Sequence, residues 1–179
     1  MKRFVLIAAG VVALSGCGGS NPKNAPPGPD PAQAMHALIV KDPKLAGKVT
    51  TLLDAGSWSV VQSVGAKDAH AIVFRLVGNK WIPDRSGRVQ IEIVGPKPGT
   101  SAPARPQVAV QFASKTPIAA SAIWVDAAQL STKQQGSSRQ GTIQGATSFD
   151  LKPGRHVAVG YARTDKSGNA IAWIFVVRH

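Results

Sequence analysis

The residues able to do chemistry in this chain are few and far apart. Its 179 residues include four histidines, one cysteine and a single glutamate, Glu92. No histidine has a second ligand at the spacing that zinc sites use, no serine lies in a Gly-x-Ser-x-Gly elbow, and one glutamate gives little material for paired-carboxylate chemistry. The sequence therefore predicts no metal site, no cofactor and no catalytic residue. The histidines are His36, His70, His156 and His179.

Cys17 is the one reactive group whose surroundings indicate a modification. Met1-Lys2-Arg3 supplies a positive start, and residues 4–14 form an uninterrupted run of apolar or small residues. A run this short cannot cross the roughly 30 Å hydrocarbon core of a bilayer. The order of a positive start, an apolar run and small residues predicts a secretory signal peptide over residues 1–16.

The residues that end this segment, Leu14-Ser15-Gly16-Cys17, resemble the lipobox of bacterial lipoproteins. The resemblance implies cleavage between Gly16 and Cys17, and attachment of acyl chains, palmitate among them, to Cys17. It also accounts for a lone cysteine without a disulfide partner, and two acyl chains suffice for stable membrane attachment. Ala13-Leu14-Ser15 offers the alternative of an ordinary signal-peptidase site, which would release a soluble protein.

A lipid anchor would place the protein in the cell envelope. Gly18 is not the aspartate that retains many lipoproteins in the inner membrane, so the expectation for a Gram-negative host is the periplasmic side of the outer membrane. The chain carries 21 Lys and Arg against 9 Asp and Glu, a net charge of +12. Lipid head groups and envelope polymers are the anions available there, and nucleic acid is not. A merely solvated basic surface is the alternative, because the basic residues are scattered.

Residues 17–29 are rich in proline and glycine and predict a flexible tether. Residues 30–94 predict a small α+β part. Asp30-Pro31 and Asp42-Pro43 each have the pattern of a capped helix start, so we expect two short helices, the second ending at Gly56. Beyond Gly56 the apolar period changes from 3.6 to 2, which predicts the strands of a small antiparallel sheet, with the run at 89–93 among them.

Residues 95–106 hold several prolines and glycines and are expected to be a linker, or else a long loop within one sandwich. Residues 107–179 alternate as strands only. Within them, 151–159, 165–169 and 173–177 resemble the last two strands of bacterial immunoglobulin-like domains. The resemblance implies an all-β immunoglobulin-like sandwich, which without cysteines would depend on the packing of Trp124, Phe149, Trp173 and Phe175.

Two residues are the expected contacts with a partner. Trp81 follows Gly-Asn-Lys near a sheet edge and is expected to be exposed, and Arg139 lies in a basic loop, 136–141, expected to be mobile. The sequence thus predicts a non-catalytic binding or scaffolding module for a protein or an anionic envelope polymer. An envelope hydrolase, or an inhibitor of one, is the alternative, and it requires His156 to meet Asp126 or Asp150 beside a serine. Nothing in the sequence indicates the oligomeric state.

Overall fold

The computed structural model describes residues 28–178, in which one helix precedes three β-sheets. We refer to them as the amino-terminal sheet (β1-β2-β3-β4), the central sheet (β6-β13-β12-β8-β9) and the outer sheet (β10-β11-β7-β5). The elements are α1 (Pro31–Lys41), the 3₁₀ turn η2 (Pro43–Leu45), β1 (Lys48–Ala55), β2 (Trp58–Val64), β3 (Ala69–Val77), β4 (Lys80–Pro83), β5 (Val89–Gly95), β6 (Ser101–Ala102), β7 (Gln107–Ser114), β8 (Ala120–Val125), β9 (Ala128–Gln129), β10 (Thr132–Gly136), β11 (Gln140–Ala146), β12 (Gly154–Arg163) and β13 (Gly168–Val177).

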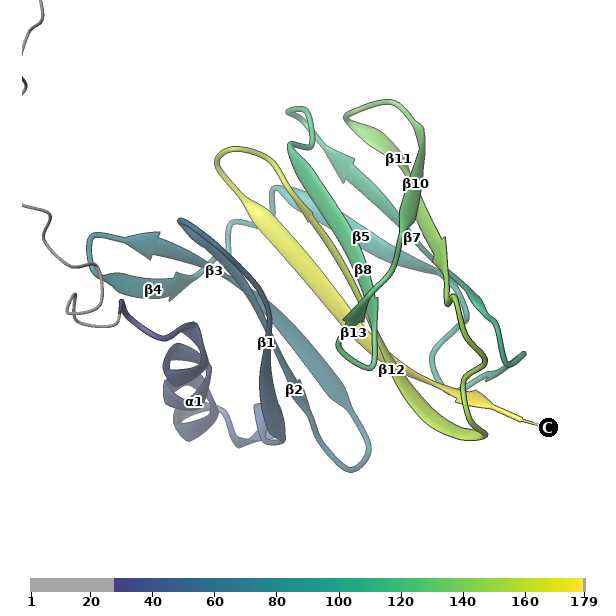
Figure 1. Ribbon diagram of the computed structural model, residues 1–179. Helices are drawn as coiled ribbons and strands as arrows, with labels where there is room; N and C mark the ends of the chain where they lie inside the picture. Colours follow the sequence, from purple (N-terminus) through teal and green to yellow (C-terminus); the bar gives the residue numbers. More distant parts are fainter. Residues whose placement is uncertain (1–27, 179) are drawn as a thin grey trace, which may run out of the picture.

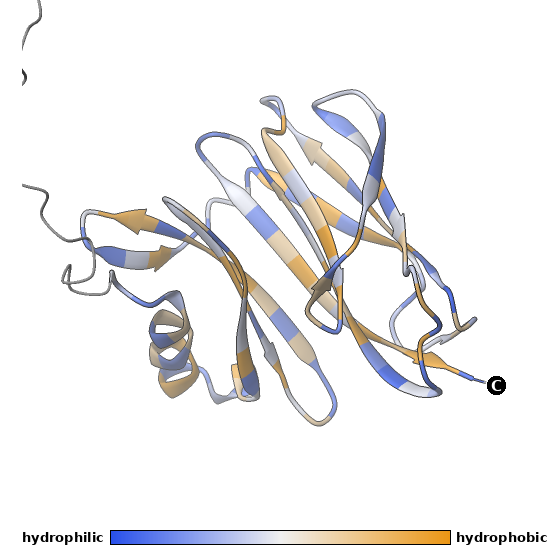
Figure 2. Ribbon diagram, viewed as in Figure 1, coloured by the Kyte–Doolittle hydropathy of each residue, from blue (hydrophilic) through white to orange (hydrophobic). Residues whose placement is uncertain are grey.

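The elements stack in four layers, with α1 outermost on one side and the outer sheet on the other (Figure 1). Three apolar clusters separate the layers. The first, around Met35, joins α1 to the amino-terminal sheet. The second, around Trp58 and Tyr161, joins that sheet to the central sheet, and the third, around Phe112 and Phe175, fills the space between the central and outer sheets. Figure 2 shows how the strands of these layers carry most of the hydrophobic residues.

The first expected helix is present, and the second is not. Asp30 caps α1 by accepting a hydrogen bond from the Ala32 N–H at 2.9 Å. After the short turn η2, however, the chain continues as strand β1. The register with β2 shifts between Thr51 and Leu53, which marks a β-bulge. The extra residue lets two consecutive leucines, Leu52 and Leu53, both pack against the second cluster. Adjacent apolar residues on one side are typical of a helix, which is why the sequence pattern predicted one.

The central and outer sheets form an immunoglobulin-like sandwich, as their strand order shows. When β5, β7, β8, β11, β12 and β13 are read as strands A, B, C, E, F and G, with β10 as D, the outer sheet has the order A-B-E-D and the central sheet contains G-F-C. This is the arrangement of immunoglobulin domains. The implication drawn from the last two strands is therefore confirmed for the fold.

The run at 89–93 belongs to this sandwich and not to the amino-terminal part. It forms β5, which pairs with β7, so the amino-terminal sheet ends at β4. The Pro/Gly-rich residues 95–106 consequently connect two strands of one sandwich, and their strand β6 pairs with β13. Alternation identified the strand correctly, but a period of 2 does not say which sheet provides its neighbour.

The aromatic core also differs from expectation. Trp173 and Phe175 are buried between the two sheets of the sandwich. Trp124 lies on the other face of the central sheet beside Tyr161, whose pKa burial raises to about 12, against the opposing effect of Arg163. Phe149 is 54% exposed. The central sheet is thus covered on both faces, which the expectation of a sandwich alone did not include.

Gly160 on β12 lies close to Val110 on β7, across the interface of the central and outer sheets. A Cβ there would lie 2.6 Å from Cγ1 of Val110. We expect Gly160→Ala to lower the free energy of unfolding by about 1–3 kcal/mol through overpacking. In a Val110→Ala background the same substitution should cost clearly less, because the clashing methyl groups are gone. Urea denaturation of the two single variants and the double variant measures this coupling, and strict additivity would contradict the close approach.

Candidate functional site

A cleft of about 770 Å³ opens at one end of the sandwich, where four chain segments meet. These are the start of β5, the end of β7, the β10–β11 hairpin and the β12–β13 hairpin, all at the upper end of the sandwich in Figure 1. Each segment contributes one cation to the lining: Arg88, Lys115, Arg139 and Lys166. No carboxylate lies among the lining residues that the structure describes.

Hydrogen bonds hold the backbone that carries Arg139. The Ser137 hydroxyl accepts from the N–H groups of Arg139 at 3.3 Å and of Gln140 at 3.0 Å. The Ser114 N–H of β7 donates to the Arg139 carbonyl at 2.8 Å. The loop that the sequence suggested as mobile is therefore tied both internally and to the neighbouring strand, with its arginine side chain exposed.

The β12–β13 turn is held as firmly beneath Lys166. Thr164 and Ser167 are buried, and the Thr164 hydroxyl accepts from the N–H groups of Lys166 at 3.2 Å and of Ser167 at 3.0 Å. From the amino-terminal part, the Asp84 carboxylate accepts from the Gly168 N–H at 2.8 Å. Two parts of the molecule thus fix the backbone from which Lys166 extends.

None of the four cleft cations takes part in an ion pair among the residues that the structure describes. The ion pairs of residues 28–178 join His70 to Asp68, Arg105 to Asp150 and His156 to Asp126. Clustered charge of one sign attracts ligands of the opposite sign. Arginine also presents a planar fork that fits a phosphate or a carboxylate with two hydrogen bonds. The cleft is therefore equipped to bind an anion.

Only one of the two expected contact residues lies in this cleft. Arg139 does, whereas Trp81 is half-buried among the side chains that pack on α1. Its indole N–H donates to the Pro29 carbonyl at 2.5 Å, so the chain entering the helix covers the ring and the expectation of an exposed Trp81 is wrong. Gly16 and Cys17, the expected cleavage and lipidation site, lie outside the described residues.

His156 does meet Asp126, as the hydrolase alternative required, but without a serine. Its Nδ1 lies 2.6 Å from the Asp126 carboxylate, and its Nε2 lies 2.7 Å from the Lys152 carbonyl. Each ring nitrogen therefore already has a hydrogen-bonding partner within the protein. The second oxygen of Asp126 accepts from the Val157 N–H at 3.0 Å. This arrangement fixes the β8–β9 turn, where Asp126 has a φ of 50°, and leaves no free nitrogen to act as a base.

A second histidine also has an aspartate and a serine close in the fold. His70 Nε2 lies 3.6 Å from Asp68, and His70 pairs across the strands with Ser63. Ser63 is fully buried, however, so a substrate has no access to its hydroxyl. Within residues 28–178, no group of three His, Cys, Asp or Glu side chains is placed to hold a metal ion, and no helix is long and apolar enough to cross a membrane.

Comparisons with known proteins add little. No protein-family model matches the sequence, and no curated protein matches it. Among solved structures, the chain is similar to titin Ig tandem domains A164-A165, with a TM-score of 0.34 and 4% identity over 75% of this chain and 83% of that chain. The immunoglobulin-like assignment rests on the strand order.

The two aspartates that the hydrolase alternative named should differ in their contribution to stability. Asp126→Ala leaves the His156 and Val157 donors without an acceptor, which should lower the free energy of unfolding by about 1–3 kcal/mol. Asp150→Ala is the matched control, because it breaks only an exposed pair with Arg105 and should cost at most about 1 kcal/mol. Chemical denaturation distinguishes the two. Equal effects would show that the Asp126 contacts do not fix the turn.

Proposed function

We propose that this protein is a lipid-anchored, non-catalytic binding module of the bacterial cell envelope that holds an anionic envelope polymer in the basic cleft. The observation that carries the proposal is the convergence of four cations, one from each of four chain segments, on a cavity lined by no carboxylate. Immunoglobulin-like sandwiches commonly recognise partners through the loops at one end. The cleft occupies such an end.

A ligand with repeated anionic groups suits this cleft best. All four cations are exposed, and an ion pair at an exposed site contributes little by itself. Useful affinity therefore requires several pairs at once, on a ligand whose charges reach different walls of the cleft. Polymers with phosphodiester or carboxylate repeats carry several anionic groups along one chain. Without Lys2 and Arg3 the cleaved protein would carry 19 Lys and Arg against 9 Asp and Glu, and this net charge of +10 would also speed the approach of such a polymer.

The anchor would keep this cleft near its ligand. The proposed lipidation at Cys17 and the tether over 17–29 precede α1 directly. A chain of that length spans at most roughly 45 Å when fully extended. The module would then work within a few tens of ångströms of the membrane surface, where anionic envelope polymers are concentrated.

Charge reversal within the cleft tests the proposed function. In the full chain, Arg88→Glu/Arg139→Glu should weaken binding to polyphosphate and to poly-glutamate at least tenfold at low salt, because it replaces two attractive contacts with repulsive ones. Binding is measured by fluorescence anisotropy of labelled polymer, and affinity should fall steeply as salt rises.

The matched control is Lys41→Glu/Lys44→Glu, which changes the net charge equally at α1 and η2, away from the cleft lining. It should weaken binding by about twofold or less. Equal losses in the two double variants would mean that overall charge, and not the cleft, binds the polymer. Unchanged affinity in the cleft variant would overturn the proposed site.

The anchor is tested separately in the native cell. Cys17→Ser should abolish incorporation of labelled palmitate and move the protein from the membrane fraction to the soluble fraction, because the thiol that receives the lipid is gone. Ser20→Ala, just behind the proposed anchor, is the control and should behave like the natural sequence. A Cys17→Ser protein that still carried palmitate and still sedimented with membranes would overturn the anchor.

A further inference from the structure

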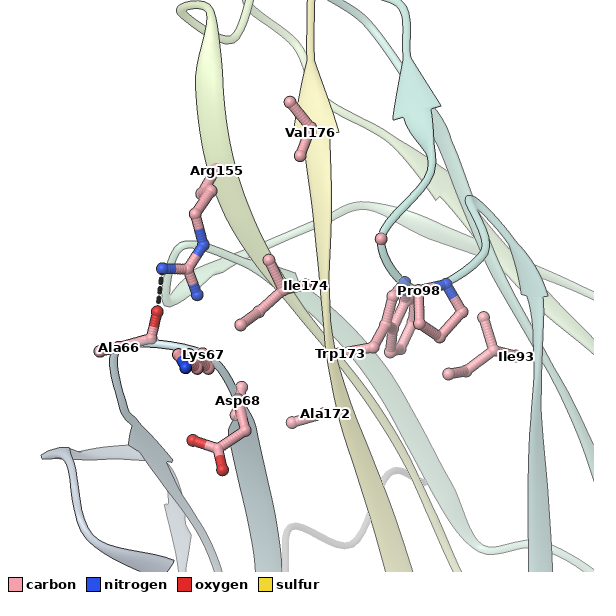
Figure 3. Close-up of a pocket in the computed structure, with 12 residues that line it drawn as sticks. Ala66, Lys67, Asp68, Ile93, Pro98, Arg155, Ala172, Trp173, Ile174 and Val176 are labelled. Atoms are coloured by element: carbon pink, nitrogen blue, oxygen red, sulfur yellow. Dashed lines mark hydrogen bonds between the residues drawn. The ribbon is translucent and has the colours of Figure 1, made fainter.

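A second cavity, of about 570 Å³, lies at the opposite end of the β12–β13 hairpin. We call it the strand groove. Figure 3 shows strand β13 running through it, with the β2–β3 turn at Ala66 to Asp68 on one side and Pro98 on the other. Ala172, Ile174 and Val176 of β13 line it, and its surface is mostly apolar.

The backbone of β13 is unpaired along part of this groove. One edge of β13 pairs with β12 over the whole strand, whereas the other edge pairs with β6 only at Val176 and Val177. At that second edge, the Ile174 carbonyl accepts from the Gly99 N–H at 2.8 Å. Alternate residues of a strand point their N–H and C=O groups to the same edge. Those of Ala172 therefore point into the groove, where no strand among the described residues pairs with them.

An unpaired strand edge is a template for another extended chain, and folded proteins usually guard such edges with charged residues, proline or a bulge. Residues 170–174 of β13 read Ala-Ile-Ala-Trp-Ile and have neither charge nor proline. The Ala170 N–H donates to the Asn169 side chain at 2.9 Å and the Ile174 carbonyl accepts from Gly99, so the open part of this edge is centred on Ala172. Here the protection is positional, because the edge is recessed between the β2–β3 turn and the segment at Pro98. Walls on both sides favour a single extended peptide over a second sheet as the chain added at this edge.

The charged residues at the mouth of the groove favour an occupant with a negative charge. Lys67 and Arg155 line it together with one acid, Asp68. The Arg155 guanidinium donates to the Ala66 carbonyl (Figure 3), which fixes its position and leaves its remaining N–H groups available. The surplus of positive charge favours a carboxylate on the occupant.

We propose that the strand groove binds an extended peptide segment of a partner protein, with small or apolar side chains and one acidic residue, as a short added strand on β13. Strand addition derives affinity from main-chain hydrogen bonds and specificity from alternate side chains. A lipid acyl chain would match the apolar lining, but it would remove water from the Ala172 N–H and C=O without replacing their hydrogen bonds, which is costly. This site is separate from the basic cleft and goes beyond the proposed function.

Because main-chain contacts dominate such binding, a generic peptide suffices as the probe. We choose acetyl-Val-Asp-Val-Thr-Val-amide at millimolar concentration and follow amide hydrogen exchange by NMR in the full chain. The Ala172 amide should exchange rapidly in the free protein and at least tenfold more slowly with the peptide. An Ala172 amide that is already protected in the free protein, or a peptide that leaves its exchange unchanged, would overturn the proposal.

Two modified peptides provide a matched control for strand addition. Methylation of every second peptide nitrogen removes the donors along one edge of the extended peptide, and methylation of the other nitrogens removes those along the opposite edge. One pattern should abolish protection of Ala172 and the other should preserve it, because only one edge faces β13. Equal behaviour of the two peptides, or protection of Ala172 by laurate in place of a peptide, would exclude strand addition.

Variants of the protein then locate the site. Ile174→Lys puts a charge in the groove and should weaken peptide binding at least tenfold, whereas Val94→Lys, at a residue of β5 that is 46% exposed and outside the lining, should leave it unchanged. Lys67→Glu, at an exposed residue of a turn, should weaken binding several-fold and remains informative if Ile174→Lys fails to fold. The cleft variant Arg88→Glu/Arg139→Glu should retain peptide binding, so the two proposals fail independently. Full peptide binding by Lys67→Glu and Ile174→Lys would place the site elsewhere.

Discussion

The constraint on which the structure depends is the burial of the β12–β13 hairpin on both faces. Its ten-residue ladder packs against the outer sheet on one side and against the amino-terminal sheet on the other. Apolar burial of this kind is the main source of folding free energy, and here one hairpin supplies two cores. The two parts are also joined by polar contacts at both ends of the hairpin: Asp84 with the Gly168 N–H, and Arg155 with the Ala66 carbonyl. The amino-terminal sheet therefore acts as a third layer of the sandwich.

Antiparallel connectivity explains how scattered cations form one cleft. In such a sandwich the chain returns to the same end after every two strands, so side chains at every second turn become neighbours in space. Arg88, Lys115, Arg139 and Lys166 follow one another at intervals of 24 to 27 residues. Each interval holds two of the longer strands with their turns, and the first two also hold the two-residue strands β6 and β9. In the sequence these residues look like a dispersed basic surface. Only the folding of the two sheets into a sandwich brings these four side chains to one cleft.

The sequence was a good guide wherever one periodic pattern had one physical cause. The cap at Asp30 and the alternation of the last strands led to the correct helix and the correct fold. Prediction failed where two causes give the same pattern, since the bulge near Leu53 imitates helical spacing and the alternation at β5 fits either sheet. Of the four cleft cations, Arg139 was predicted as a contact because it lies in a basic loop. No local sequence pattern distinguished the other three. The unpaired edge of β13 could not be predicted from the sequence either, because strand pairing depends on neighbours that are distant in the chain.

The two proposed sites lie toward opposite ends of one hairpin. Their arrangement determines how a scaffold could act on two ligands at once. The groove begins at Ala172, which pairs with Val159, and reaches Arg155, so it lies roughly 13–26 Å along β12 from the end that borders the basic cleft, and the layers on both faces keep that separation fixed. A rigid spacer does not transmit a conformational change, because coupling between sites requires an element with two arrangements. What it does provide is a fixed geometry: a polymer held at one end and a peptide at the other would raise the local concentration of each for the other without any coupling. The proposed scaffolding role thus follows from the same double burial that stabilises the fold.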